Sequence, residues 1–97
     1  MRQLRVYTLK PGSTDRFVAA WKGGVLPLRG RFGYVIEGAW LVPGRATFVW
    51  ILRHDGGEPW EELERRYYGS PERESMNPDP RPFIARAENY FLESVLD

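Results

Sequence analysis

Three runs of the sequence have the residue types of β-strands and are apolar on both of their faces. They span Leu4–Leu9, Tyr34–Val42 and Ala46–His54, and each is rich in β-branched and aromatic residues. Because successive strand side chains point to opposite faces of a sheet, each run supplies apolar side chains to both faces. A sheet built from these strands therefore needs cover on both sides, since a large exposed apolar patch usually marks an interface or a pocket.

The segments between these strands have helical spacing. From Asp15, apolar residues recur every three or four positions as far as Phe32, and Gly33 follows as a candidate helix C-cap. Pro27 predicts a kink or break within this helix. A second helix is expected after Asp55, with its apolar stripe at Trp60, Leu63 and Tyr67.

The C-terminal third predicts a long connection and a closing strand. The stretch GSPERESMNPDPRP contains four prolines, which favours an irregular segment with at most one helical turn. The secondary structure of the next segment, Phe83–Leu96, is ambiguous, but its second half, Asn89–Val95, resembles a strand more than a helix. The element order is then β-α-β-β-α-β, which predicts an α+β, ferredoxin-like domain over residues 1–97. Its sheet would have four antiparallel strands and both helices on one face.

Composition excludes several classes of protein. The 97-residue chain has a net charge of +1, so no electrostatic argument favours nucleic acid or an anionic membrane as a partner. With no cysteine and one histidine, we expect neither a disulfide nor a metal site, and nothing indicates a cofactor. No apolar run is long enough to span a bilayer and no signal peptide is visible, so a cytoplasmic protein is expected. Arginine supplies twelve of the fourteen basic residues, which is typical of a GC-rich bacterial genome.

Strand alternation predicts which residues share a face. A hairpin loop of two or four residues around Pro43–Ala46 places Glu37 on the same face as Trp50, whereas a loop of three or five residues would invert this relation. The face expected beneath the helices comprises Leu4, Val6, Tyr34, Ile36, Trp40, Val49 and Ile51. The other face comprises Arg5, Tyr7, Leu9, Val35, Glu37, Leu41, Phe48, Trp50, Leu52 and His54. We expect a second copy of the chain to cover that face, giving a dimeric α/β barrel with its helices outside.

Four residues of this second face are candidate catalytic residues: Arg5, Tyr7, Glu37 and His54. Arg5 and Tyr7 would polarise a substrate oxygen, and His54 or Glu37 would act as the base. The alternatives are a structural Arg5–Glu37 ion pair and a hydrogen-bonded His54 at the strand end. A role for His54 as a heme ligand is weaker, because nothing else indicates heme.

Apolar neighbours of these residues are candidate substrate-binding residues. They are Leu9, Phe48, Trp50 and Leu52. Aromatic side chains can stack on a flat substrate or donate hydrogen bonds to it. The alternative is that they only pack the interior of the barrel.

Several motifs resemble the NIPSNAP family, a branch of the dimeric α/β-barrel superfamily. These are YTLKPG at residues 7–12, LPLR at 26–29 and GAW at 38–40, with looser matches in SPERES and ENYFL. ILRHDG at 51–56 resembles the end of the family's third strand, where the family has Tyr at the position of His54. The family also tends to carry His near Trp50. The resemblance implies a homodimer of ferredoxin-like subunits, with a cavity in each subunit between the sheet and the dimer mate.

The resemblance implies no single reaction. Related branches of the superfamily include cofactor-independent monooxygenases acting on polyketide aromatics, heme-degrading enzymes, and cyclases and dehydratases. The leading hypothesis is a homodimer that binds a hydrophobic, aromatic or polyketide-like molecule and that, if catalytic, performs cofactor-free cyclisation, isomerisation or oxygenation in biosynthesis. The competing hypothesis is a non-catalytic NIPSNAP-like structural or protein-interaction module.

Overall fold

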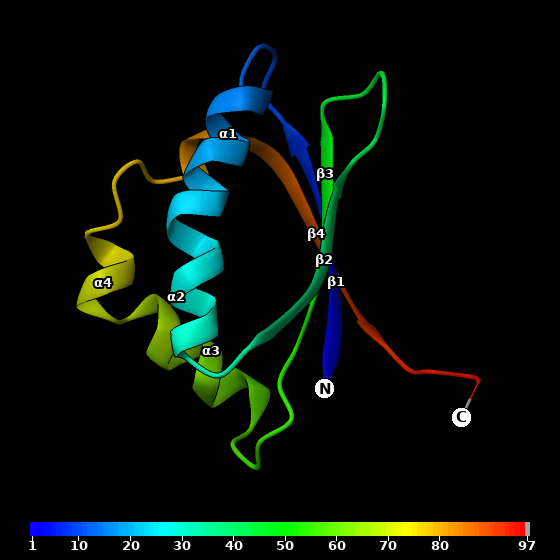
Figure 1. The fold of residues 1–97 in the computed structure, drawn as a ribbon, viewed down its shortest axis with the longest axis vertical. Coiled ribbons are helices and arrows are strands. Elements are labelled where there is room, and N and C mark those ends of the chain that lie inside the picture. Colours follow the sequence, from blue (N-terminus) through cyan, green and yellow to red (C-terminus); the bar gives the residue numbers. More distant parts are fainter. Residues whose placement is uncertain (97) are drawn as a thin grey trace.

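Four strands form one antiparallel sheet, and all of the helices pack on one of its faces (Figure 1). The structure is a computed structural model that describes residues 1–96. The elements in chain order are β1 (Arg2–Leu9), α1 (Thr14–Ala20), η1 (Trp21–Val25), α2 (Leu26–Arg31), β2 (Val35–Leu41), β3 (Thr47–Arg53), α3 (Trp60–Tyr68), α4 (Pro71–Glu74), η2 (Arg81–Phe83) and β4 (Ile84–Leu92). Within this described range, no helix is long and apolar enough to cross a membrane.

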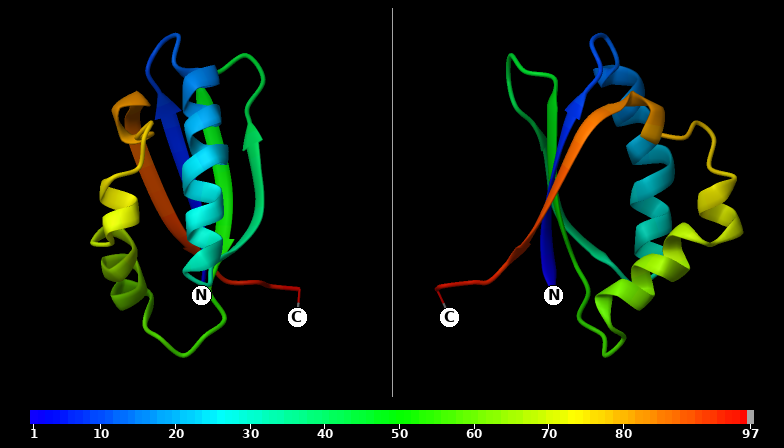
Figure 2. Two further views of the ribbon diagram at one scale, coloured as in Figure 1. Left: turned by 60° about the vertical axis from the view of Figure 1, so that its left-hand side comes forward. Right: turned by 180° about the vertical axis from the view of Figure 1, so that it is seen from behind.

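The strand order β2-β3-β1-β4 is that of the ferredoxin-like fold, which confirms the predicted fold class. The two views of Figure 2 show the sheet from different sides, with the helices always on the same side of it. The closing strand β4 lies nearer the N-terminus than the predicted Asn89–Val95. Its first half is poor in β-formers, and pairing with β1, from Leu9 opposite Ile84 to Arg2 opposite Leu92, holds it extended.

The first helical region runs without a break from α1 through η1 to α2. The predicted kink at Pro27 is replaced by the wide π-helical turn η1, in which the Leu26 N–H donates to the Trp21 carbonyl five residues earlier. Proline in a regular helix clashes with the carbonyl four residues earlier, and here that residue, Gly23, lies within the wide turn. The chain leaves the helix at Gly33, where φ is +92°.

The core lies between the helices and the sheet face that carries the larger aromatic side chains. Along β1 and β3 the buried residues are Gln3, Arg5, Tyr7, Leu9, Phe48, Trp50 and Leu52. The prediction that Leu4, Val6, Trp40, Val49 and Ile51 lie beneath the helices is therefore wrong. Alternation divides a strand into two faces but does not identify the covered one when both are apolar. Tyr34 and Ile36 do join the core, as predicted.

A β-bulge changes the alternation of β2. Leu41 pairs with Phe48 and Ala39 with Trp50, so this part of the strand shares faces with β3 as predicted. The register shifts between Ile36 and Gly38, and Glu37 is the extra residue. The shift turns Glu37 onto the helix-free face of the sheet, opposite to the face that carries Trp50.

Candidate functional site

A cavity of about 210 Å³ lies inside the protomer, between the sheet and the helices. Its lining residues come from β1, β3, β4 and all of the helical segments. They are Arg5, Tyr7, Phe17, Trp21, Val25, Arg29, Trp50, Tyr67, Tyr68, Arg73, Pro80, Arg81, Ile84, Ala87 and Asn89. Four of these, Tyr68, Arg81, Ala87 and Asn89, are exposed, so the cavity opens between β4 and the segment after α3.

Aromatic rings form much of the cavity wall. Tyr7 meets Phe17 edge to face, with their ring centroids 5.9 Å apart, and meets Trp50 at 6.3 Å. Trp21, from η1, packs edge to face on Trp50 with centroids 5.3 Å apart. These contacts hold the rings in fixed orientations, so a flat ligand would meet a rigid aromatic surface.

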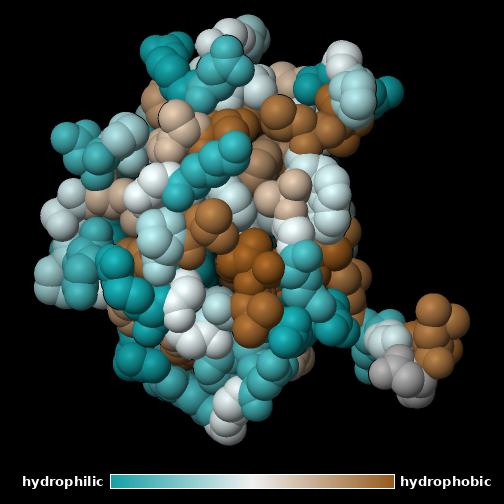
Figure 3. Space-filling view, viewed as in Figure 1, coloured by the Kyte–Doolittle hydropathy of each residue, from teal (hydrophilic) through white to brown (hydrophobic). Residues whose placement is uncertain are grey.

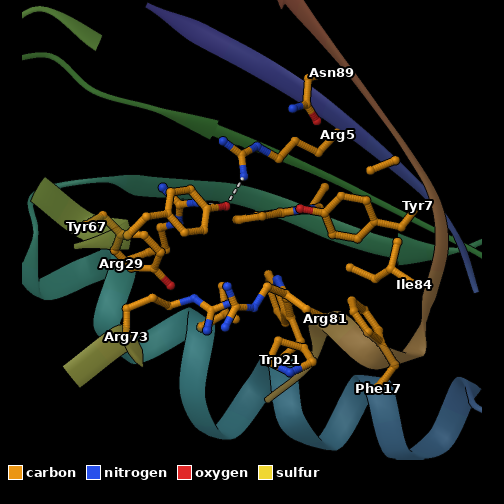
Figure 4. A pocket seen from close by; sticks show the side chains of 15 residues that line it. Arg5, Tyr7, Phe17, Trp21, Arg29, Tyr67, Arg73, Arg81, Ile84 and Asn89 are labelled. Atoms are coloured by element: carbon orange, nitrogen blue, oxygen red, sulfur yellow. Dashed lines mark hydrogen bonds between the residues drawn. The ribbon is translucent and has the colours of Figure 1, made fainter. Parts of the chain in front are cut away.

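A buried charge cluster forms one end of the cavity. Glu64 of α3 accepts hydrogen bonds from three donors at once: Arg5 of β1, Arg29 of α2 and the Tyr34 hydroxyl. The side chains of Arg5 and Arg29 are only 5% and 1% exposed, so the two guanidinium groups share one carboxylate away from water. Both arginines also donate to the Tyr68 hydroxyl at 3.1 Å. In Figure 4 a dashed line from Arg5 marks one of these bonds.

The cluster fixes the charge states of its members. Burial by itself raises the pKa of Glu64, but Arg29 and Arg5 outweigh it and lower that pKa below its usual value. Burial by itself lowers the pKa of Arg5, but Tyr7, Tyr68 and Glu64 outweigh burial and raise that pKa above its usual value. Glu64 is thus an ionised structural acceptor near neutral pH and a poor proton acceptor for a substrate.

Two further arginines line the cavity. Arg73 of α4 is buried, and one of its terminal nitrogens lies 3.5 Å from Asp79, longer than an ordinary hydrogen bond. Arg81 is exposed and binds the same carboxylate at 2.8 Å. One aspartate is therefore shared between two guanidinium groups, just as Glu64 is shared between Arg5 and Arg29.

A second hollow, of about 200 Å³, lies at the edge of the sheet near β2. Figure 3 shows apolar atoms at the surface between the helices and the sheet. The hollow is lined by Val18, Trp21, Lys22, Ala39, Trp40, Leu41 and Phe48. It contains no buried charged residue, so it offers fewer directional contacts than the cavity under the helices.

Comparison with known proteins identifies the fold. No protein-family model matches the sequence, and no curated protein matches it. A NIPSNAP family protein from Agrobacterium tumefaciens superimposes with a TM-score of 0.85 at 10% identity, covering 98% of this chain and 93% of that one. An uncharacterized NIPSNAP domain protein from Burkholderia xenovorans gives 0.83 at 14% identity, covering 99% and 96%. The chain shares its fold with these NIPSNAP proteins.

The same comparison finds a more distant group with this fold. An antibiotic biosynthesis monooxygenase superimposes on the chain with a TM-score of 0.68 at 10% identity, covering 97% of each chain. At such low identity the likeness concerns the arrangement of the backbone. The chemistry of this chain depends on its own side chains.

The NIPSNAP fold brings three of the predicted site residues together. Arg5, Tyr7 and Trp50 all line the cavity under the helices. The prediction that they face a dimer mate is wrong, because their sheet face is the one that the helices cover. Leu9 and Leu52 share that face and are buried in the core outside the cavity lining, and Phe48 lines the second hollow.

Two predicted catalytic residues lie elsewhere in the NIPSNAP fold. Glu37 binds Arg2 and Arg53 on the helix-free face, so the predicted contact between Glu37 and Arg5 is wrong. Its hydrogen bond from Arg2 lowers the pKa of Glu37. His54 follows the end of β3, and its ring centroid lies 6.0 Å from that of Tyr34. Neither residue lines the cavity.

Sequence reasoning missed the charged residues that the helices contribute. Arg29 follows Trp21 and Val25 at eight and four residues, which places it on the buried stripe of its helix. Glu64 lies four residues after Trp60 and three before Tyr67, on the buried stripe of α3. The signal was therefore a charged residue at an apolar position of each helix. Among residues 1–96, no group of three or more His, Cys, Asp or Glu side chains is arranged to hold a metal ion.

Proposed function

We propose that this protein binds a flat hydrophobic small molecule in the cavity between its sheet and its helices. The observation that carries the proposal is an aromatic-walled cavity that contains the buried polar groups of Arg5 and Tyr7. Its volume of about 210 Å³ exceeds the roughly 150 Å³ that accommodates benzene in a protein core. A ligand with one or two fused rings fits this space, and small-molecule sites generally combine apolar walls with a few polar groups.

Cofactor-free proton-transfer chemistry on the bound molecule is the second candidate function. The likeness to an antibiotic biosynthesis monooxygenase favours it as an analogy of fold. Arg5 and Tyr7 would stabilise an enolate or phenolate oxygen in such a reaction. The base would have to come from outside the lining, because Glu37 and His54 do not line the cavity and Glu64 is ion-paired. Binding is therefore the better supported function, and a non-catalytic interaction module is the alternative if no small molecule binds.

We further propose that the protein is a homodimer whose two copies meet through their helix-free sheet faces. At the centre of this face Leu4 lies opposite Ile51 and Val6 opposite Val49, all of them only half-buried. Trp40, on the same face, is 51% exposed. Brown atoms along the right-hand border of Figure 3 lie on this side of the molecule. A two-fold axis through the centre of the face would bury the same apolar strip from both copies.

The binding proposal is tested by titrating the protein with 2-naphthol, a neutral two-ring probe. The four tryptophans act as internal reporters in a heteronuclear NMR titration. The indole signals of Trp21 and Trp50, which line the cavity, should shift, whereas that of Trp40 on the opposite sheet face should not. A shift of Trp40 without a shift of Trp50 would place the probe in the second hollow and contradict the proposal.

A blocking variant makes the test site-specific. Ala87→Trp places an indole at the exposed opening of the cavity and should weaken binding of the probe by about tenfold or more. Ala19→Trp is the matched control, because Ala19 is exposed on α1 and outside the lining. Equal weakening by both variants, or by neither, would show that the probe binds elsewhere.

A further inference from the structure

Among the polar groups of the residues that line the cavity, hydrogen-bond donors outnumber acceptors. Among the described residues, five buried side-chain atoms have no hydrogen-bond partner. They are Trp21 Nε1, Arg29 Nε, Trp50 Nε1, Tyr67 Oη and Arg73 Nε. Each of them can donate a hydrogen bond, and all five residues line the cavity.

The burial of these groups makes their lack of partners costly. Tyr67, Arg29 and Trp50 are at most 1% exposed, and Trp21 and Arg73 are 3% and 4% exposed. A buried donor without a partner is destabilising, and a charged donor more so. These donors therefore mark the residues around the cavity as richer in hydrogen-bond donors than in acceptors.

The charges around the cavity show the same imbalance. Four arginines line it, at positions 5, 29, 73 and 81, and the carboxylates bound to them are Glu64 and Asp79. Two positive charges are left without a matching carboxylate in this group. Arg73 is the least engaged of the buried arginines, since its contact to Asp79 is 3.5 Å long. An anion placed beside Arg73 and Arg29 would balance this end of the cavity.

The two ends of the cavity differ in polarity. Figure 4 shows Arg29, Tyr67 and Arg73 at one end, and Phe17, Tyr7 and Ile84 at the other. The guanidinium of Arg29 also stacks on the ring of Tyr67, with its Cζ 3.8 Å from the ring centroid. This contact helps to hold the guanidinium in place. A ligand that spans both ends has an anionic head and an apolar, flat body.

We propose, resting on the binding function above, that the ligand is an aromatic carboxylate. Its carboxylate lies at the end formed by Arg29 and Arg73, and its ring lies between Tyr7, Phe17 and Ile84. A planar carboxylate accepts paired hydrogen bonds from guanidinium groups, and its size leaves room in the cavity for a ring system.

The proposal is tested by calorimetric titration of the unmodified protein with 2-naphthoate and with 2-naphthamide at pH 7. The two probes have the same body, and only the carboxylate is charged at this pH. The carboxylate should bind at least about tenfold more tightly, and its advantage should shrink with added salt. Equal affinities, or a preference for the amide, would overturn the carboxylate proposal and leave the binding function intact. If neither probe nor 2-naphthol binds, the proposed function itself fails.

Variants that each remove one positive charge test where the carboxylate of the probe binds. Arg73→Gln and Arg81→Gln should each reduce the ratio of carboxylate to amide affinity, whereas Arg65→Gln should leave it unchanged. Arg65 is exposed, lies outside the cavity lining and pairs with Glu62, so it controls for the loss of one positive charge. Arg81 is exposed, so its variant keeps the experiment decisive if Arg73→Gln does not fold. An unchanged ratio in the folded cavity variants would overturn the placement of the carboxylate.

Discussion

Glu64 is the residue on which the charged end of the cavity depends. It joins α3 to β1 through Arg5 and to α2 through Arg29, so one carboxylate links three elements. Removing one partner of a buried ion pair leaves an uncompensated charge, which is much more costly than losing a surface pair. The same residue fixes the positions of two guanidinium groups beside the cavity, so we expect it to contribute both to stability and to the proposed ligand binding.

We predict that Glu64→Gln lowers the free energy of unfolding at neutral pH by about 3 kcal/mol. The folded-state pKa of Glu64 is depressed by Arg29 and Arg5 against the cost of burial. Its contribution to stability is therefore present above the unfolded-state pKa of about 4.3, and it is lost as the pH falls through the folded-state value. Urea unfolding between neutral and acidic pH should show a shallower loss of stability for the variant than for the natural sequence.

Glu61→Gln is the control for this pH experiment. Glu61 lies in the first turn of the same helix and is exposed. Its replacement should change the stability by no more than about 0.5 kcal/mol. If both variants lose the same stability, the burial of the Glu64 cluster does not have the assigned effect.

At the scale of elements, the passage from α2 to β2 places the charge cluster. The helix ends at Arg31, and Gly33 turns the chain back toward the sheet with φ at +92°. Tyr34 then directs its hydroxyl to Glu64, and burial together with this hydrogen bond raises the pKa of Tyr34. The left-handed conformation of one glycine thus helps to bring the phenol into the cluster.

We predict opposite effects for two glycine substitutions in this region. Gly33→Ala should destabilise the protein by about 1 kcal/mol, because a Cβ is disfavoured at positive φ. Gly30→Ala should stabilise it by up to about 1 kcal/mol, because Gly30 lies within α2 and an added Cβ would meet no atom within 4 Å. Thermal unfolding of the two variants measures both effects, and a stabilising Gly33→Ala would contradict the account of the turn.

At the scale of the whole molecule, the sheet is covered on one side only. The helices shield the face that carries the large aromatic side chains, and the face centred on Val6 and Val49 stays without cover within the protomer (Figure 2). Charged groups lie at its margins, with Glu37 between Arg2 and Arg53 at one of them. An apolar centre with a charged rim is the usual composition of a protein interface.

We predict that the protein is a dimer at micromolar concentration and that Ile51→Glu converts it to a monomer. The substitution places a carboxylate at the centre of the helix-free face, where a dimer would bury it without a partner. Leu26→Glu is the matched control, since Leu26 is 37% exposed on α2, away from this face. Light scattering coupled to gel filtration reports the masses. A monomeric natural protein, or a dimer unaffected by Ile51→Glu, would refute the proposed interface.

Local patterns in the sequence determined the element order and the class of fold. Strand-forming runs, two amphipathic stripes and the proline-rich connection predict β-α-β-β-α-β because each depends on residues close in the chain. They also grouped Arg5, Tyr7 and Trp50 on one face, since alternation has a period of two. These three residues line the cavity that the structure shows.

Only the tertiary structure decided which sheet face the helices cover and where the charges meet. Both faces are apolar, so the choice depends on how side-chain volumes fill the space beneath the helices, and the larger aromatic rings occupy it. The extra residue Glu37 changed which sheet face the side chains of part of β2 point to. Regular alternation of side chains does not predict such a change. The cluster of Arg5, Arg29 and Glu64 joins residues up to 59 positions apart, and such a contact arises only when the helices pack on the sheet.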